Sequence, residues 1–160
     1  MKRSSDERKE KAVSSDEKER EEKKMVKRTK VSIPQRLPLG VCVKVASLRP
    51  AYSDLESWLR NEKNVLVCRS GRVFIGKGTA KHVFHYRSSE WANPFTVKDH
   101  GLDESLRLFR EHLDKLLLDA PVRERFISLA EAEHIGCFCD PGAKCHRDVI
   151  LEKLKSLIVD

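Results

Sequence analysis

The sequence predicts a small single-domain α/β fold, in which helices pack on a mixed sheet, preceded by a disordered charged N-terminal tail. Several short runs alternate apolar and polar residues at the period of a strand, and longer runs repeat apolar residues every three or four positions. Strand-like and helix-like runs interleave along the chain, which is typical of α/β domains. We therefore divide the chain into a charged tail and linker, residues 1–37, and an α/β domain, residues 38–160.

The composition of the tail sets it apart from the domain. The chain has 160 residues and a net charge of +7, and residues 1–30 hold 12 Lys/Arg and 8 Asp/Glu with very few apolar side chains. Such a segment cannot bury enough apolar surface to offset its ordering entropy. Its excess charge of 12 − 8 = +4 allows non-specific contact with nucleic acid through counterion release. A solvating tail of mixed charge fits the same composition equally well.

The sequence also bears on the compartment. No run approaches the ~18 apolar residues that a membrane-spanning helix needs, and the first residues are charged. We therefore expect no membrane contact and an intracellular location, cytoplasmic or nuclear. The five cysteines are an odd number without the spacing of a disulfide scaffold, so they are expected to be reduced thiols.

The first elements of the domain follow a linker that contains Pro34 and Pro38. Alternating valines predict a strand over residues 41–47. The capping-box pattern at residues 53–56 then predicts a short helix over residues 54–61. Its buried side is expected to carry Leu55, Trp58 and Leu59.

Two β-type runs come next, at residues 65–68 and 73–75. Residues 69–72 between them have the composition of a turn, so the two runs are predicted to pair as a hairpin. Residues 79–101 lack periodicity and are rich in aromatic and histidine side chains. Because long irregular loops inside compact domains are often functional, we expect this loop to contribute to a site.

The second half of the domain has the clearer patterns. Asp103 is a good N-cap for a helix from residue 104 to about 119, and Pro121 fits the first turn of a helix that runs to about residue 132. A strand is predicted over residues 134–139, and a last helix from Cys145 or His146. The residues expected to face the core are Leu106, Phe109, Leu113, Leu116, Val122, Phe126, Leu129, Ile150, Leu154 and Leu157.

The junction between the last strand and the last helix carries the residues most suited to chemistry. Strand-to-helix junctions are where α/β proteins place their sites. At a helix N-terminus the free N–H groups and the dipole favour an anion and lower the pKa of a thiol, which makes Cys145 the candidate reactive thiolate. His146 is the candidate general acid or base, and Asp148 would orient it or act as a base. Arg147 supplies a fixed positive charge that suits phosphate.

Zinc binding is the alternative interpretation of the same residues. Cys137, Cys139, Cys145 and His146 could supply four ligands. The Cys-x-Cys spacing argues against it, because residues two apart on an extended strand are separated by ~6.6 Å along the chain. Cys137 and Cys139 would also serve as small buried apolar side chains. The sequence therefore predicts no cofactor and keeps zinc as the less favoured alternative.

The order of the motifs resembles the family known as domain of unknown function 4326. They are Phe74-Ile75-Gly76-Lys77, Trp91-Ala92-Asn93-Pro94-Phe95, Gly136-Cys137-Phe138-Cys139-Asp140-Pro141 and Cys145-His146-Arg147-Asp148. The resemblance covers roughly residues 41–157 and implies a small α/β domain linked to nucleotide or nucleic-acid metabolism. It marks as site residues Gly76, Trp91, Asn93, Pro94, Cys137, Cys139, Cys145, His146 and Asp148. The chain departs from the family pattern where Ala92 and Arg147 replace the usual glycines, and where the stretch 78–90 is longer.

Together the residues and the resemblance give a leading hypothesis and an alternative. The leading hypothesis is an enzyme-like or ligand-binding domain for a phosphorylated or nucleotide-like small molecule, whose anionic group lies at the N-terminus of the last helix. Cys145, His146 and Asp148 would be its catalytic residues, and its ligand-binding residues would be Gly76, Lys77, Trp91, Asn93 and Arg147. The alternative is a non-catalytic adaptor with a structural zinc site and a tail that contacts nucleic acid.

Overall fold

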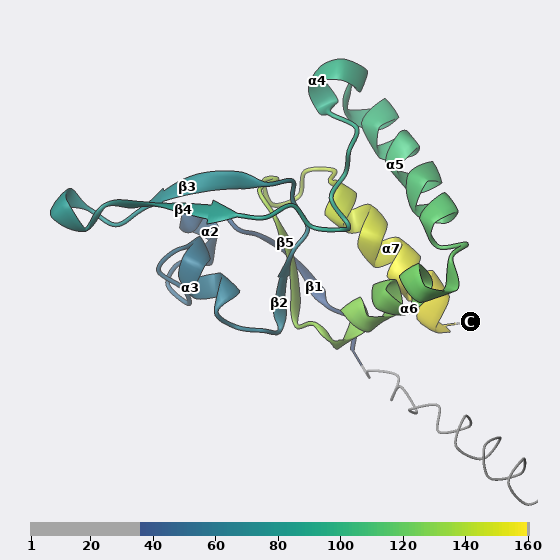
Figure 1. Ribbon diagram of the computed structural model, residues 1–160, viewed down its shortest axis with the longest axis horizontal. Coiled ribbons are helices and arrows are strands. Elements are labelled where there is room, and N and C mark those ends of the chain that lie inside the picture. The colour runs from purple at the N-terminus through teal and green to yellow at the C-terminus, as the bar shows by residue number, and fades with distance from the viewer. Residues whose placement is uncertain (1–35, 160) are drawn as a thin grey trace, which may run out of the picture. The chain divides into compact units, whose positions relative to one another are not determined.

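A central sheet of three parallel strands organises the fold. The computed structural model describes residues 36–159, which all belong to one compact unit. The strand order is β1 (Leu39–Cys42), β5 (His134–Cys137) and β2 (Asn64–Leu66), so the last strand is central (Figure 1). The predicted α/β class is confirmed. The charged tail predicted over residues 1–37 lies, except for its last two residues, outside the described residues.

A second sheet is the antiparallel hairpin of β3 (Gly71–Ile75) and β4 (His82–Tyr86), joined through the 3₁₀ turn η1 (Gly78–Ala80). The sequence-based pairing of residues 65–68 with 73–75 is therefore wrong, because β2 pairs in parallel with β5 instead. The strand β4 also lies within the predicted loop. Its histidines and aromatic side chains obscured a normal strand alternation, in which Phe84 and Tyr86 are half-buried and His85 is exposed.

Helices cover both faces of the parallel sheet (Figure 1). On one face lie α2 (Val45–Leu48) and α3 (Leu55–Leu59), together with the hairpin. The other face is covered by α5 (Leu102–Leu116), α6 (Ala120–Ser128) and α7 (His146–Val159), and the short helices α4 (Val97–His100) and η2 (Leu129–Glu131) connect these elements. The strand predicted over residues 41–47 ends at Cys42, and the chain turns there into α2.

Side chains of β5 alternate between two hydrophobic clusters. Ile135 and Cys137 are buried in the larger cluster with α5, α6 and α7. Gly136 and Phe138 face the smaller cluster, which contains Trp58 of α3. The residues divide in this way because successive side chains of a strand point to opposite sides.

The helix ends show which capping predictions hold. A capping box opens α3 one residue later than the predicted box at residues 53–56: Asp54 is the N-cap, and its side chain accepts a hydrogen bond from the backbone N–H of Ser57. Asp119 caps α6, which begins at Ala120 with Pro121 in its first turn. Asp103 is not a cap, because α5 begins one residue before it and Gly101 occupies the N-cap position. Among the described residues, no helix is both long and apolar enough to cross a membrane.

Candidate functional site

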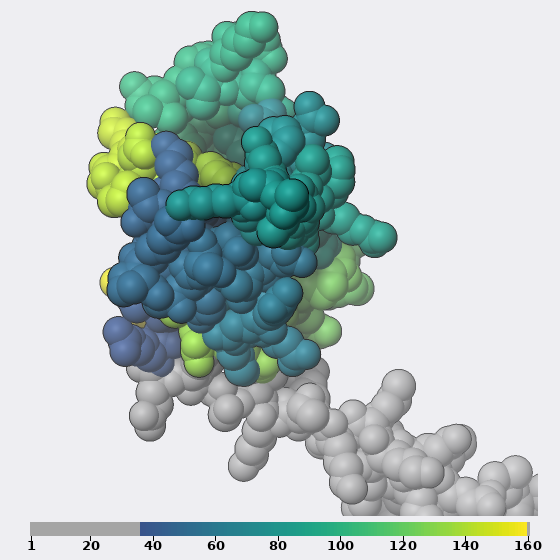
Figure 2. Space-filling view, turned by 90° about the vertical axis from the view of Figure 1, so that its left-hand side faces the viewer, coloured from purple at the N-terminus to yellow at the C-terminus, as the bar shows by residue number. Residues whose placement is uncertain are grey.

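A pocket of about 740 Å³ lies at the carboxyl ends of β2 and β5, beside the first residue of α7. Ligands of open α/β sheets bind at this end of the strands. Figure 2 shows the region between the projecting hairpin and the helices α4 and α5, where atoms of the segment after β5 are visible. Segments far apart in the sequence line the pocket, and its polar and aromatic side chains include Arg69, Ser70, Tyr86, Asn93, Phe95 and His146.

Three cysteines meet at the inner wall of this pocket. The sulfur atoms of Cys137, Cys139 and Cys145 all lie within 4.8 Å of one another. Cys137 and Cys145 are buried and their sulfurs are 2.8 Å apart, whereas Cys139 is half-buried. The spacing that argued against this convergence assumes an extended strand through residue 139. It does not apply, because β5 ends at Cys137 and the turn that follows brings Cys139 back toward it.

The thiols of this group differ in their affinity for protons. Cys137 accepts hydrogen bonds from Cys145 and from the backbone N–H of Cys139, and together with the charge of Arg147 these lower the pKa of Cys137 to about 6. The proton shared with Cys137 and burial raise the pKa of Cys145. This direction is opposite to the one expected for Cys145 from the helix N-terminus. The hydrogen bonds from Cys145 and Cys139, together with the charge of Arg147, therefore favour a thiolate at Cys137.

His146 lies at the start of α7 with both ring nitrogens facing protein atoms. Its Nε2 is 2.6 Å from the carbonyl oxygen of Val67, and its Nδ1 is 3.6 Å from the sulfur of Cys145. A carbonyl oxygen only accepts, so Nε2 carries the proton and Nδ1 holds a lone pair. Burial lowers the pKa of His146, which keeps the ring neutral near pH 7. The carbonyl of Val67 orients this ring, and the partner of Asp148 is Arg147.

Arg147 is almost fully buried and does not line the pocket. Its Nε donates to Asp148 at 3.3 Å, and its side chain lies against Gly40 of β1. A methyl group added at Gly40 would approach the Nε of Arg147 to 2.8 Å. The cation therefore lies inside the protein beside Cys137, whereas the sequence placed it as a phosphate ligand.

The Trp91–Phe95 motif is divided between the core and the pocket. Trp91 is buried and packs edge-on against Phe126, with 5.1 Å between the ring centroids. Asn93 lines the pocket together with Phe95. Its amide also stabilises the loop, because Nδ2 donates to the hydroxyl of Ser105 at 2.9 Å and Oδ1 accepts from the backbone N–H of Phe95. Trp91 therefore fixes the motif to the core, and Asn93 and Phe95 are the residues of the motif that line the pocket.

Gly76 and Lys77 lie away from the pocket, at the tip of the β3–β4 hairpin. Gly76 has a positive φ of 85°, and a methyl group there would meet the carbonyl oxygen of Ala80 at 2.5 Å. The glycine is thus required by the turn. Lys77 is exposed beside it.

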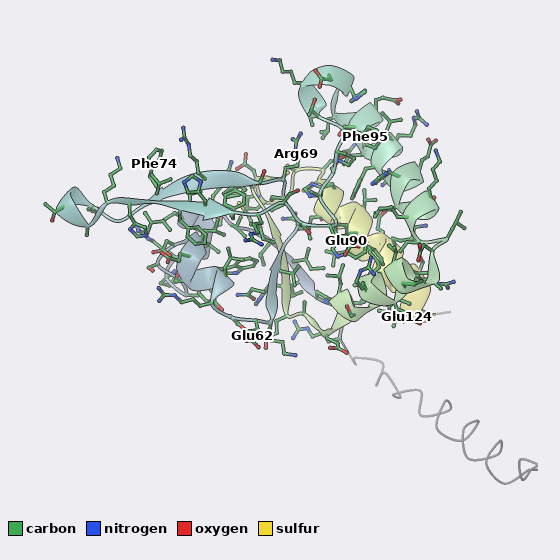
Figure 3. All side chains as sticks on the ribbon, in the orientation of Figure 1. Glu62, Arg69, Phe74, Glu90, Phe95 and Glu124 are labelled. Atoms are coloured by element: carbon green, nitrogen blue, oxygen red, sulfur yellow. The ribbon has the colours of Figure 1, made fainter. Side chains whose placement is uncertain are left out.

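Sequence reasoning missed Arg69, Ser70 and Tyr86 as pocket residues. Arg69 and Ser70 were assigned to a hairpin turn, although they follow the strand β2 and so lie at the carboxyl edge of the parallel sheet. The signal that could have found them is the apolar run Val65–Cys68, which fits a buried parallel strand. In Figure 3, Arg69 and Phe95 lie on the same side of the molecule, above the end of the sheet.

Comparison with known proteins gives one match. The sequence model of the family described as Domain of unknown function (DUF4326) matches residues 52–156. This range includes the hairpin, all the segments that line the pocket, and most of α7. Neither the curated proteins nor the solved structures contain a match.

Proposed function

The chain belongs to the DUF4326 family, as its motifs predicted, and we propose that its pocket binds a phosphorylated, nucleotide-like small molecule. The single observation that carries the proposal is the convergence of distant segments on one cavity of about 740 Å³ at the carboxyl ends of β2 and β5. Cavities of roughly 300–1,000 Å³ are typical of small-molecule sites. The size is sufficient for a base, a sugar and a phosphate.

Charge favours an anionic group at the outer end of the pocket. Arg69 is exposed at the pocket wall, and none of the side chains of residues 36–159 that line the cavity is acidic. The N-terminal end of α7, at His146, adds the positive end of a helix dipole. The anion site expected at this helix would then include Arg69, which takes the phosphate-binding role first assigned to Arg147.

Aromatic side chains favour a planar group in the same pocket. Tyr86 and Phe138 pack against each other with ring centroids 5.6 Å apart, and both line the cavity together with Phe95. Aromatic faces bind nucleobases by stacking, whatever the base. Ser70 and Asn93 supply hydrogen-bonding groups that could read a sugar or base edge. Catalysis by Cys145, His146 and Asp148 stays a prediction, and of the three only His146 lines the pocket.

A thermal-shift screen tests the proposal. The full chain is heated with nucleoside mono- and diphosphates, free nucleosides, ribose 5-phosphate and inorganic phosphate. A ligand present at 100 times its Kd stabilises the folded state by about 2.7 kcal/mol, so a binding nucleotide should raise Tm clearly. We expect phosphorylated nucleotides to act and free nucleosides to act less.

Matched arginine variants separate pocket binding from general charge effects. Arg69→Gln removes the cation at the pocket wall and should abolish most of the shift. Arg123→Gln removes an exposed cation of α6 outside the pocket and should leave the shift intact. If no compound in the panel stabilises the wild type, or if both variants respond as the wild type does, the proposal is wrong.

A further inference from the structure

Three cysteine sulfurs converge behind the pocket, Nδ1 of His146 lies 3.6 Å from the sulfur of Cys145, and we propose that these four groups form a zinc site. The ligands are Cys137, Cys139, Cys145 and Nδ1 of His146. The proposal does not depend on which small molecule the pocket binds.

The backbone directs the three sulfurs toward one point. Cys137 ends β5, Cys139 lies in the turn that follows, and Cys145 immediately precedes α7. Two backbone N–H groups donate to these sulfurs at 3.4 Å, from Cys139 to Cys137 and from Arg147 to Cys145. Hydrogen bonds of this kind orient the ligands of a metal site and stabilise their anionic form. All three cysteines are free thiols.

His146 is held in the form that a metal ligand requires. Its Nε2–H donates to the carbonyl of Val67 at 2.6 Å, which fixes the ring and leaves the lone pair on Nδ1. Nδ1 is 3.6 Å from the sulfur of Cys145. Metal-bound histidines usually make such a bond from the nitrogen that does not bind the metal. The histidine thus offers a neutral nitrogen donor next to the sulfurs.

The surrounding charge fits a metal centre with three thiolates. A divalent ion with three thiolates and a neutral imidazole carries one net negative charge. Arg147, the residue after His146, supplies one positive charge on a side chain that is only 7% exposed. Buried charges are rarely found without a partner of opposite sign.

The ligand set and its spacing favour zinc. Three thiolates and one imidazole are a common structural zinc set, with Zn–S distances of about 2.3 Å. A tetrahedron of that size places two sulfurs about 3.8 Å apart. The sulfurs of Cys137 and Cys145 are 2.8 Å apart, so binding requires them to separate by about 1 Å. Cys145 ends a loop without helix or strand structure, which can provide this shift.

Metal analysis of the full chain is the first test. We expect about one zinc ion for each chain after purification without chelators, and its release by a mercurial that titrates thiols. Cobalt exchanged into the site should give the thiolate charge-transfer bands and visible bands of a tetrahedral centre. A wild-type chain that carries no zinc and that binds neither zinc nor cobalt after reduction would overturn the proposal. So would a Cys137–Cys145 disulfide whose reduced form takes up no metal.

Two serine variants supply a matched comparison. Cys139→Ser removes a proposed ligand, whereas Cys68→Ser changes a half-buried thiol that lines the same pocket but lies outside the three-sulfur group. We expect Cys139→Ser to lose most of the zinc and Cys68→Ser to keep it. His146→Ala should alter the cobalt spectrum, because nitrogen is replaced by water. Equal zinc content in both serine variants would contradict the assignment. If a variant does not fold, the cobalt spectrum of the wild type still tests the proposal, because it shows whether thiolates bind the metal.

From a different observation, we also infer that the outer face of the β3–β4 hairpin binds single-stranded nucleic acid. Cross-strand neighbours share this face: Arg72 lies opposite His85, and Phe74 lies opposite Val83. Phe74 is 62% exposed and Val83 is 41% exposed. Figure 3 shows Phe74 on the side of the hairpin turned away from α3. The opposite face packs on the cluster around Trp58.

The charged residues of the hairpin segment are all basic. Residues 69–87 contain five Lys/Arg and no Asp or Glu, in a chain that has 25 acidic residues. The Nζ of Lys81 is 5.2 Å from the ring centroid of Phe74. Proteins bind single strands by combining an exposed aromatic ring, on which bases stack, with basic side chains on the same surface, which contact the phosphates.

Fluorescence anisotropy with a labelled oligonucleotide of about 12 nucleotides tests this inference. Phe74→Ala should weaken binding by about tenfold, because stacking on one base contributes about 1–3 kcal/mol. Arg72→Gln should reduce the slope of log K against log salt, and Arg123→Gln should behave as the wild type. Every variant keeps the charged tail, so the differences belong to the hairpin. The inference is wrong if Phe74→Ala binds like the wild type, if duplex is preferred, or if polyglutamate competes equally well.

Discussion

Replacing Gly136 with alanine tests the packing on which the whole site rests. Gly136 lies in the central strand β5, and its carbonyl accepts a hydrogen bond from the backbone N–H of Val67. A methyl group at this position would lie 2.5 Å from Cγ1 of Val43 and 2.7 Å from the ring of Trp58. Normal contacts between carbon atoms are about 3.5–4.0 Å, so these groups must move by about 1 Å.

The structure leaves little room for that movement. Val43 and Trp58 are 1% and 2% exposed, and β5 is held by β1 and β2 on its two sides. Overpacking of a core costs typically 1–3 kcal/mol, and we expect Gly136→Ala to fall near the upper end. For a domain of this size, this corresponds to a fall in Tm of roughly 10 °C. Urea unfolding followed by tryptophan fluorescence and circular dichroism measures the change.

A double-mutant cycle with Val43→Ala shows whether the clash is the cause. Val43→Ala alone should destabilise the protein by about 2 kcal/mol, because it removes buried methyl groups. In the double variant the methyl group introduced by Gly136→Ala enters the vacated space, so the combined cost should be smaller than the sum by about 1 kcal/mol or more. A Gly136→Ala variant as stable as the wild type, or two changes whose costs simply add, would refute the reasoning.

Three further changes have expected costs that chemical denaturation can measure. Ser105→Ala should cost about 1–3 kcal/mol, because the buried hydroxyl that binds the amide of Asn93 is lost. Phe126→Ala should cost about 3–5 kcal/mol, because its ring is fully buried. Asp54→Ala should cost about 1 kcal/mol through loss of the α3 cap. The N–H of Ser57 lowers the pKa of Asp54 below its ordinary value of 3.8, so the cap's contribution is present above that value and is lost as pH falls through the lower folded pKa. A cost that is unchanged on acidification would contradict the capping assignment.

Local patterns were sufficient to predict the second half of the domain. Leu106, Phe109 and Leu113 are buried at helical spacing in α5, and Ile150 and Leu154 are buried in α7. These helices have apolar stripes long enough to specify their buried faces without knowledge of their neighbours. The strand β5 was also predicted, and its successive residues face the two different clusters of the core.

Strand pairing could not be predicted in the same way. The run Val65–Cys68 lies next to β3 in the sequence, but β2 pairs with a strand that begins 70 residues after it, at His134. Parallel pairing depends on contacts across the whole chain, so an apolar run that fits a buried strand does not by itself identify the strand with which it pairs. The same wrong pairing explains why Arg69 and Ser70 were not predicted as pocket residues. They follow β2, and the pocket lies at the carboxyl end of this strand.

The cysteines show how one strand end changes a chemical inference. Two residues of separation argue against shared coordination only while the backbone is extended. The strand β5 ends at Cys137, so the sulfur of Cys139 returns to within 4.8 Å of it. Sequence alone predicted the strand to within two residues, and those two residues decide whether the sulfurs can meet.

Arg147 is the residue whose departure from the family pattern needs a physical explanation. A buried guanidinium requires negative charge nearby, and its carboxylate partner, Asp148, is 47% exposed at 3.3 Å. Solvent weakens that pair, so the remaining compensation must come from the sulfur atoms, and the charge of Arg147 does lower the pKa of Cys137. Gly40 provides the space, because any side chain there would meet the Nε of Arg147. The cation at this position therefore stabilises negative charge on the cysteine cluster, and the phosphate contact in the proposed function is assigned to Arg69 instead.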